Sequence, residues 1–192
     1  MSVNAREAIL TEARNAAQKH GYNGINFRSI AARVGIKNAS IFYHFASKAK
    51  LGAVVAHQYC QDTVECLESI RNISSSAQQA LSHYPAIFRK SLENENRLCL
   101  SSFMAAEYED LPEEVKTEVE AFVDANVRWL SRVLSEKDGG DAEAYKTQAL
   151  AIYTAVAGAQ LIARTRQSIE LFDELIVAYQ KAGLIPTDQS HS

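Results

Sequence analysis

Residues 34–51 read VGIKNASIFYHFASKAKL, and four consecutive positions, residues 42–45, carry the rings of Phe, Tyr, His and Phe. A short helix in an ordinary core buries one stripe of side chains and leaves the rest polar. Consecutive side chains on a helix point about 100° apart, so four adjacent rings must face all the way round it. The stretch therefore predicts a helix whose rings face two different environments.

The spacing of the rings divides them between these two surfaces. Ile41 and Phe45 are four residues apart and share one face, with Phe42 one step round. These three side chains are predicted to pack against neighbouring helices. Tyr43 and His44 then face outward, where a hydroxyl and an imidazole can reach phosphate oxygens and base edges. For a lone histidine, a partly buried ring is the alternative.

The helix that follows begins with charges of an unexpected sign. Ser47 is its predicted N-cap, and Lys48 and Lys50 lie in its first turn, where the positive end of the helix dipole favours acids. Each lysine is misplaced there by about 0.3–1 kcal/mol. A docked phosphate would satisfy both the dipole and the lysines. Two solvated lysines are the alternative.

Two further helices are predicted upstream. Helical spacing of aliphatic and small residues gives the first, over about residues 3–20. Asn26 caps the second, which ends at Gly35, and a turn leads to the third, over about residues 39–45. Two short helices joined by a Gly-containing turn in basic surroundings are typical of a helix-turn-helix, whose second helix enters the major groove of DNA. An ordinary pair of short helices in an all-helical protein is the alternative.

The composition of the 192-residue chain indicates an all-α protein. Hydrophobic residues make up 47% of it, while eight glycines and three prolines leave little material for turns, and no strand pattern appears. Residues 1–50 carry eight Lys or Arg and two acids, a net charge of +6, which leaves −9 for the remainder of a chain whose total is −3. One end of the chain is therefore suited to an anionic partner.

Several other classes of protein are disfavoured. No apolar run approaches the about 20 residues of a membrane span, and Arg6 and Glu7 lie where a signal peptide needs an apolar core, so we expect a cytoplasmic protein without a membrane partner. The three cysteines lack metal-ligand spacing, the histidines are scattered, and no Gly-rich phosphate loop or nucleophile motif is present. We expect no metal, no cofactor and no enzymatic activity.

Helical periodicity continues to the C-terminus. The sequence predicts about nine helices in all, the later ones over about residues 48–72, 77–92, 97–108, 112–137, 141–166 and 168–182. A small basic three-helix unit is thus joined, through a shared fourth helix, to a larger acidic bundle. Residues 186–192 are predicted to be a disordered tail.

Residues 27–51, FRSIAARVGIKNASIFYHFASKAKL, resemble the DNA-binding signature of the tetracycline-repressor (TetR) family of bacterial transcription regulators. In that signature an IA-x-x-x-GV turn is followed by a T-L-Y-x-Y-F-like helix and then by S-K-x-x-L. The matching positions here are Ile30, Ala31, Gly35, Ile36, Ser40, Ile41, Phe42, His44, Phe45, Ser47, Lys48 and Leu51. The resemblance implies a helix-turn-helix domain over residues 1–46 and a ligand-binding and dimerisation domain over residues 47–185.

The function implied by the resemblance is that of a homodimeric regulator, usually a repressor, which binds a near-palindromic operator in double-stranded DNA and is released by a small-molecule inducer. Carried over by position, contacts to bases or nearby phosphates would come from Arg28, Asn38, Ala39 and Ser40, and contacts to the DNA backbone from Lys37, Tyr43, His44 and Lys48. Lys37 departs from the Ser or Thr that commonly caps this helix, which shifts the expected cap to Asn38. Ala39 stands where glycine is frequent and offers only a methyl group.

In this family the larger half holds the inducer and dimerises through its last two long helices. The corresponding residues 142–166 carry small side chains suited to close helix approach, and residues 168–182 carry an apolar stripe. An internal core pair within one chain predicts the same composition. Candidate inducer contacts are polar or polarizable groups set among rings: Cys99, Phe103, Glu107, Phe122, Asn126, Trp129, Tyr153 and Gln160.

Residues 98–123, LCLSSFMAAEYEDLPEEVKTEVEAFV, resemble a branch of the family that includes the N-ethylmaleimide-responsive repressor. Its members sense electrophiles through a cysteine followed by leucine, which corresponds here to Cys99, although Leu98 replaces the glycine usual before it. A buried cysteine acting as a small hydrophobe is the alternative. For the whole chain, the rival hypothesis is a helical adaptor that has the helix-turn-helix shape but binds protein instead of DNA.

Overall fold

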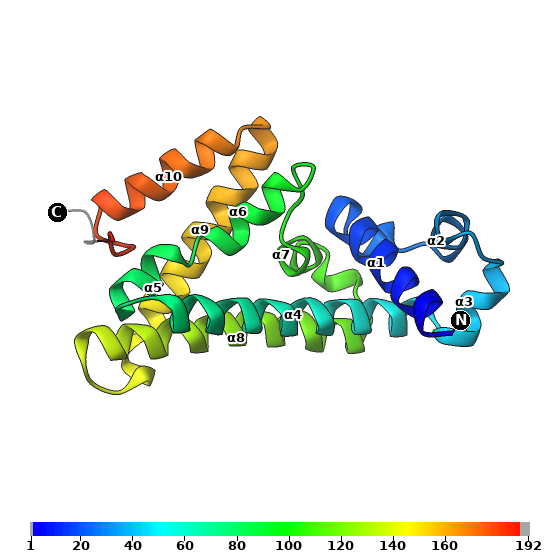
Figure 1. Cartoon of the computed structure of the whole chain (residues 1–192), viewed down its shortest axis with the longest axis horizontal. Helices are drawn as coiled ribbons and strands as arrows, with labels where there is room; N and C mark the ends of the chain where they lie inside the picture. The colour runs from blue at the N-terminus through cyan, green and yellow to red at the C-terminus, as the bar shows by residue number, and fades with distance from the viewer. Residues whose placement is uncertain (1, 189–192) are drawn as a thin grey trace. The chain divides into compact units, whose positions relative to one another are not determined.

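The computed structural model describes residues 2–188, and every regular element within them is helical (Figure 1). The prediction of an all-α fold is confirmed. The α-helices are α1 (Ser2–His20), α2 (Phe27–Val34), α3 (Asn38–His44), α4 (Lys48–Ile73), α5 (Ala77–His83), α6 (Ala86–Glu93), α7 (Leu100–Ala105), α8 (Glu113–Asp138), α9 (Lys146–Arg166) and α10 (Ile169–Lys181). Short 3₁₀ turns are η1 (Tyr22–Gly24), η2 (Tyr108–Asp110) and η3 (Ala142–Tyr145).

One predicted helix is divided in the structure. The stretch expected as a single helix over residues 77–92 forms α5 and α6, which meet at Tyr84 and Pro85. Proline lacks the N–H that continues a helix, and its ring clashes with the carbonyl group four residues earlier. Pro85 instead takes the N-cap position of α6.

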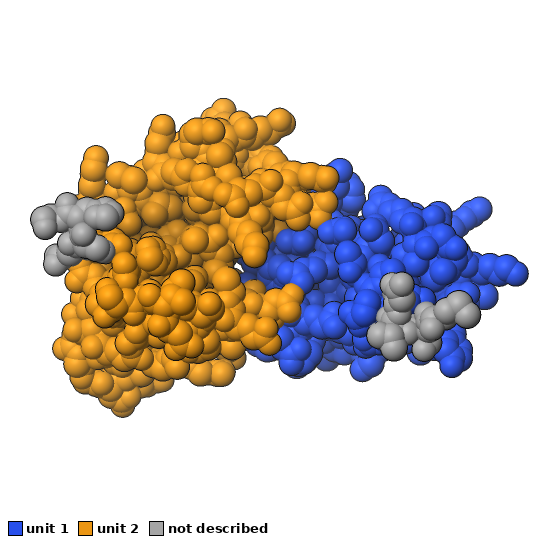
Figure 2. Space-filling model, viewed as in Figure 1, with its two compact units in different colours: residues 1–61, 99–122 blue, residues 62–98, 123–192 orange. Residues whose placement is uncertain are grey.

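The chain forms two compact units, coloured separately in Figure 2. Unit 1 comprises residues 1–61 and 99–122, and unit 2 comprises residues 62–98 and 123–192. Two of the three boundaries fall inside long helices, α4 and α8, and the third lies just before α7, so these units divide the chain at other positions than residue 46. The functional division at residue 46 therefore stays a prediction.

The core of unit 1 is built around α1. This helix packs against α2, η1 and α7, and α2 packs in turn against α3. Small side chains of α1, Ala13 and Ala17, are completely buried and let these neighbours approach. Around them lie the aliphatic and aromatic side chains that close the core: Ile9, Ile25, Ile30, Ile41, Phe45, Leu51, Leu100 and Met104.

The core of unit 2 joins α9 to α6 and α10. Phe88 of α6 and Phe172 of α10 are each 1% exposed, and the inward face of α9 follows a helical spacing at Ile152, Val156 and Ala159. Part of the predicted pairing of the last two helices is thus an internal core contact within one chain. The opposite face of α9 carries exposed apolar side chains, Leu150 and Leu161.

The end of the described chain contacts α5. Gln78 Nε2 donates to the carbonyl oxygen of Thr187 at 2.9 Å, and Gln79 Nε2 donates to Asp188 Oδ2 at 3.2 Å. The remainder of the predicted tail, residues 189–192, lies outside the described residues. Among the helices from residue 2 to residue 188, none is long and apolar enough to cross a membrane.

Candidate nucleic-acid interface and ligand cluster

The turn between α2 and α3 has the geometry of a helix-turn-helix. Asn26 caps α2 by accepting the N–H of Ser29 on its side-chain oxygen at 3.0 Å, as predicted. At the other end Gly35 adopts φ 75°, and the N–H of Ile36 donates to the carbonyl oxygen of Ala31 at 3.0 Å. A Cβ at Gly35 would meet nothing within 4 Å, so the left-handed backbone alone requires glycine here.

The structure corrects the expected start of α3. Lys37, not Asn38, is the N-cap residue, and its side chain makes no cap hydrogen bond. Asn38 is the first helical residue and is exposed. Its amide is therefore not used as a cap, which leaves the whole side chain on the surface beside Ala39.

The rings of α3 divide mostly as their spacing predicts. Ile41 and Phe45 are 0% and 2% exposed, and Tyr43 is 85% exposed, which confirms two of the three inward side chains and the outward tyrosine. The prediction that Phe42 packs inward is wrong, since it is 54% exposed. One step round from Ile41, its ring reaches only the edge of the core, where it contacts the Phe27 ring edge-on at 4.9 Å between centroids.

The start of α4 holds its cap and one ordered lysine. Ser47 Oγ accepts the N–H of Lys50 at 3.0 Å, which confirms the predicted cap. Lys48 is half-buried, and its Nζ lies 4.3 Å from the centroid of the Tyr22 ring. Burial lowers the pKa of the Lys48 ammonium, and the nearby Glu107 carboxylate opposes that shift. This lysine is therefore held in place, unlike the exposed Lys50.

All eight predicted DNA contacts lie in unit 1, on α2, the turn, α3 and the first residue of α4, and all keep solvent exposure. Five are exposed and three half-buried; the exposed ones are Arg28, Lys37, Asn38, Ala39 and Tyr43, and the half-buried ones Ser40, His44 and Lys48. The charges of the surrounding sequence are of one sign. Residues 13–61 contain no Asp or Glu, while the same stretch carries seven Lys or Arg. The stretch is therefore cationic, and the acid that pairs with Arg33 at 3.6 Å, Glu12, lies outside it.

Four predicted inducer contacts lie in unit 2, and two aromatic residues bring them together. The Tyr84 hydroxyl donates to Asn126 Oδ1 at 2.9 Å, and the Tyr84 ring stacks on Trp129 with centroids 5.9 Å apart. Phe88 contacts the Tyr153 ring edge-on at 6.2 Å, and its carbonyl oxygen accepts from Gln160 Nε2 at 2.7 Å. Tyr84 was missed by sequence reasoning. Its place before Pro85, at the break between two helices, was the available signal.

The other four candidates lie in unit 1 and do not form one cluster. Cys99 is 2% exposed at the N-cap of α7, and Phe103 is half-buried. Phe122 is 1% exposed and stacks on Tyr59 with centroids 5.6 Å apart. Both carboxylate oxygens of Glu107 are engaged within the unit, with the N–H of Tyr22 and the side chain of Asn23. We therefore leave Glu107 out of the inducer site.

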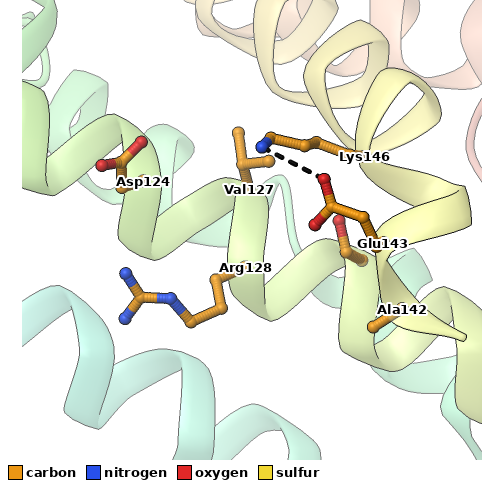
Figure 3. A pocket seen from close by; sticks show the side chains of 7 residues that line it. Asp124, Val127, Arg128, Ala142, Glu143 and Lys146 are labelled. Carbon is orange, nitrogen blue, oxygen red and sulfur yellow. Dashed lines mark hydrogen bonds and ion pairs between the residues drawn. The ribbon is translucent and has the colours of Figure 1, made fainter.

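A surface depression of about 290 Å³ lies between α8 and the start of α9 (Figure 3). Lys146 Nζ pairs there with Glu143 Oε1 at 3.3 Å. The lining, Asp124, Val127, Arg128, Ser131, Ala142, Glu143 and Lys146, includes none of the predicted inducer contacts. A smaller depression of about 150 Å³ between α4 and α8 is lined by Trp129, whose buried indole Nε1 has no hydrogen-bond partner. This second depression adjoins the aromatic cluster through Trp129.

An all-α chain with this capped α2–turn–α3 unit on a cationic surface is a helix-turn-helix protein. Its sequence matches the family described as "Bacterial regulatory proteins, tetR family" over residues 9–53. It is 31% identical in sequence to a TetR transcriptional regulator from Legionella pneumophila, whose crystal structure superposes with a TM-score of 0.84 over 92% of this chain and 95% of that one. The chain belongs to the TetR family and is a transcriptional regulator.

Two other similarities are narrower. The transcriptional repressor AcnR of Corynebacterium efficiens is 38% identical over 56 residues, which are 29% of this chain and 30% of AcnR. The reduced form of NemR from E. coli has a TM-score of 0.78 over 96% of this chain and 99% of that one, at 18% identity. The NemR similarity shows the fold alone. The assignment to an electrophile-sensing branch therefore stays a prediction.

Proposed function

We propose that the protein is a one-component cytoplasmic repressor that binds a near-palindromic operator as a homodimer and is released by a small molecule. The observation that carries the proposal is the α3 surface. It presents an 85% exposed tyrosine and an uncommitted Asn38 within a stretch of 49 residues, 13–61, that lacks any acid. A surface of one sign with hydrogen-bonding tips is suited to the phosphates and base edges of a major groove.

The eight residues have two proposed roles. Arg28, Ser40 and the start of α3 face base edges, where guanidinium, amide and hydroxyl groups can read the sequence. Lys37, Tyr43, His44 and Lys48 hold the phosphates and fix the register. Ala39 contributes a methyl group that suits thymine.

The outward face of α9 supports the homodimer. Leu150 and Leu161 are 38% and 51% exposed, and Val177 of α10 is 45% exposed. Between the two leucines lies Gly158, which is exposed and where an added Cβ would meet nothing within 4 Å of this chain. A strip of apolar and small residues on a helix surface is suited to close approach of the same helices from a second copy.

The purified protein should bind DNA from the region upstream of its own gene, with an affinity that falls steeply as salt rises. Arg28→Ala should cost about 1–3 kcal/mol on the preferred sequence and relax its specificity. Lys48→Ala should weaken binding to all sequences and reduce the salt slope by about one phosphate contact. The absence of any sequence preference on DNA, combined with a partner protein still bound by both variants, would establish the adaptor instead.

For the inducer we propose the aromatic cluster around Asn126, Trp129, Tyr153 and Gln160 as the binding site. A ligand would reach it at Trp129, whose free indole N–H can donate a hydrogen bond.

Whether the buried Cys99 is also a sensor can be tested separately. A mild electrophile should add to Cys99, as followed by mass spectrometry, and release the operator in the wild type but not in Cys99→Ser. Addition without release would show that this cysteine is only a core residue.

A further inference from the structure

The carboxylate of Glu107, just after α7, is bound to the turn that follows α1. Tyr22 N–H donates to Glu107 Oε2 at 2.6 Å, and Asn23 Nδ2 donates to Glu107 Oε1 at 3.1 Å. Both partners lie in η1, which leads from α1 into α2 of the helix-turn-helix. A charged acceptor with two donors is among the stronger interactions in a protein.

Two glycines make room for this arrangement. Gly21 has φ 69°, and a Cβ there would lie 2.2 Å from Glu107 Oε2. At Gly52 of α4 a Cβ would lie 2.7 Å from Cε2 of the Tyr22 ring. Any larger residue at either position would displace the carboxylate or the ring, so the carboxylate and the ring both depend on glycine.

The Tyr22 ring also contacts a residue of the proposed DNA-binding surface. Tyr22 is 8% exposed, and Lys48 Nζ lies 4.3 Å from its centroid, a distance typical of a cation–π interaction. Lys48 is the first residue of α4 and is one of the proposed phosphate contacts. Glu107, Tyr22 and Lys48 therefore form one connected series, which we call the Glu107 series.

The negative charge of Glu107 allows a positioning role in DNA binding to be distinguished from a purely electrostatic one. A carboxylate close to a cationic DNA-binding surface repels DNA, so removing it should raise affinity if electrostatics alone mattered. We propose that Glu107 is a positioning residue for DNA binding, which fixes the turn after α1 and, through the Tyr22 ring, the ammonium of Lys48. The proposal rests on the proposed function, because it concerns the same DNA surface.

The test compares operator affinities of variants with matched changes of charge. Glu107→Ala should lower the affinity about tenfold, the size expected for loss of a hydrogen-bonded charged group. Glu109→Ala removes the same charge from a neighbouring exposed position and should leave affinity unchanged or raise it. Glu107→Gln keeps an oxygen acceptor for Tyr22 N–H and should restore part of the loss. Asn23→Ala breaks one of the two bonds without removing a charge and should lower affinity by a smaller factor.

A second comparison tests the route through Lys48. Glu107→Ala should cost less affinity in a Lys48→Ala background than in the wild type, because the group that it positions is already gone. Equal losses in the two backgrounds, or a higher affinity of Glu107→Ala than of the wild type, would overturn the proposal. Circular dichroism and urea unfolding of each variant identify any that fails to fold, and Asn23→Ala, an exposed residue, then carries the test. Failure of the wild type to bind DNA would instead refute the proposed function.

Discussion

Two polar side chains, Asn126 and Gln160, are buried in the core of unit 2. Asn126 and Gln160 are both 0% exposed, and each makes a hydrogen bond to an element distant in sequence, through Tyr84 and the Phe88 carbonyl. Buried amides are costly unless they are satisfied. These two bonds therefore fix α8 against the α5–α6 junction and α9 against α6, in addition to any part that the amides play in ligand contact.

Tyr84→Phe tests the cost of one such bond. The variant keeps the ring and its stacking but deprives Asn126 of the hydroxyl donor, so unfolding should require about 1–3 kcal/mol less free energy. Tyr43→Phe, at an 85% exposed ring, is the control and should change stability by less than about 0.5 kcal/mol. Urea unfolding followed by circular dichroism measures both. Equal stabilities of the two variants would show that the buried bond contributes nothing net.

At the scale of elements, the turn from α2 to α3 depends on a single glycine. Gly35→Ala should lower the free energy of unfolding by about 1–2 kcal/mol, since the left-handed backbone at φ 75° penalises a Cβ although nothing crowds it. Gly35→Asn should cost less, because asparagine tolerates this conformation. Thermal unfolding of the two variants ranks them. A loss as large for asparagine as for alanine would mean that side-chain crowding, not the backbone, decides this position.

The sequence predicts elements that depend on local rules and misses those that depend on distant partners. Spacing alone places Ile41 and Phe45 in the core and Tyr43 outside, and the caps Asn26 and Ser47 follow from their side chains. The Glu107 series could not be predicted, because Glu107 and Tyr22 are 85 residues apart and nothing local distinguishes this carboxylate from its exposed neighbours.

The helix break at Pro85 depends both on a local rule and on the surrounding fold. A proline is compatible with the first turn of a helix and incompatible with its interior, so its effect depends on where the helix begins. The apolar periodicity runs across residues 77–92 and conceals that beginning. Tyr84, at the break, bonds to Asn126, and this contact with a residue distant in sequence follows from no local pattern.

For the whole molecule, function as proposed depends on a second copy, and Gly158 tests where that copy binds. Within one chain Gly158→Leu should be tolerated, because the position is an exposed site on α9 with open space around its Cβ and leucine favours a helix by about 0.5–1 kcal/mol over glycine. In a dimer that packs helices closely at Gly158 the same side chain would hold the two copies apart. Sedimentation should then show monomers, and operator affinity should fall at least tenfold because two linked half-sites are no longer engaged together. Ala121→Leu, on an exposed face of α8, introduces the same side chain elsewhere and should remain dimeric. A Gly158→Leu protein that stays dimeric and keeps its affinity would place the interface elsewhere than on this face of α9.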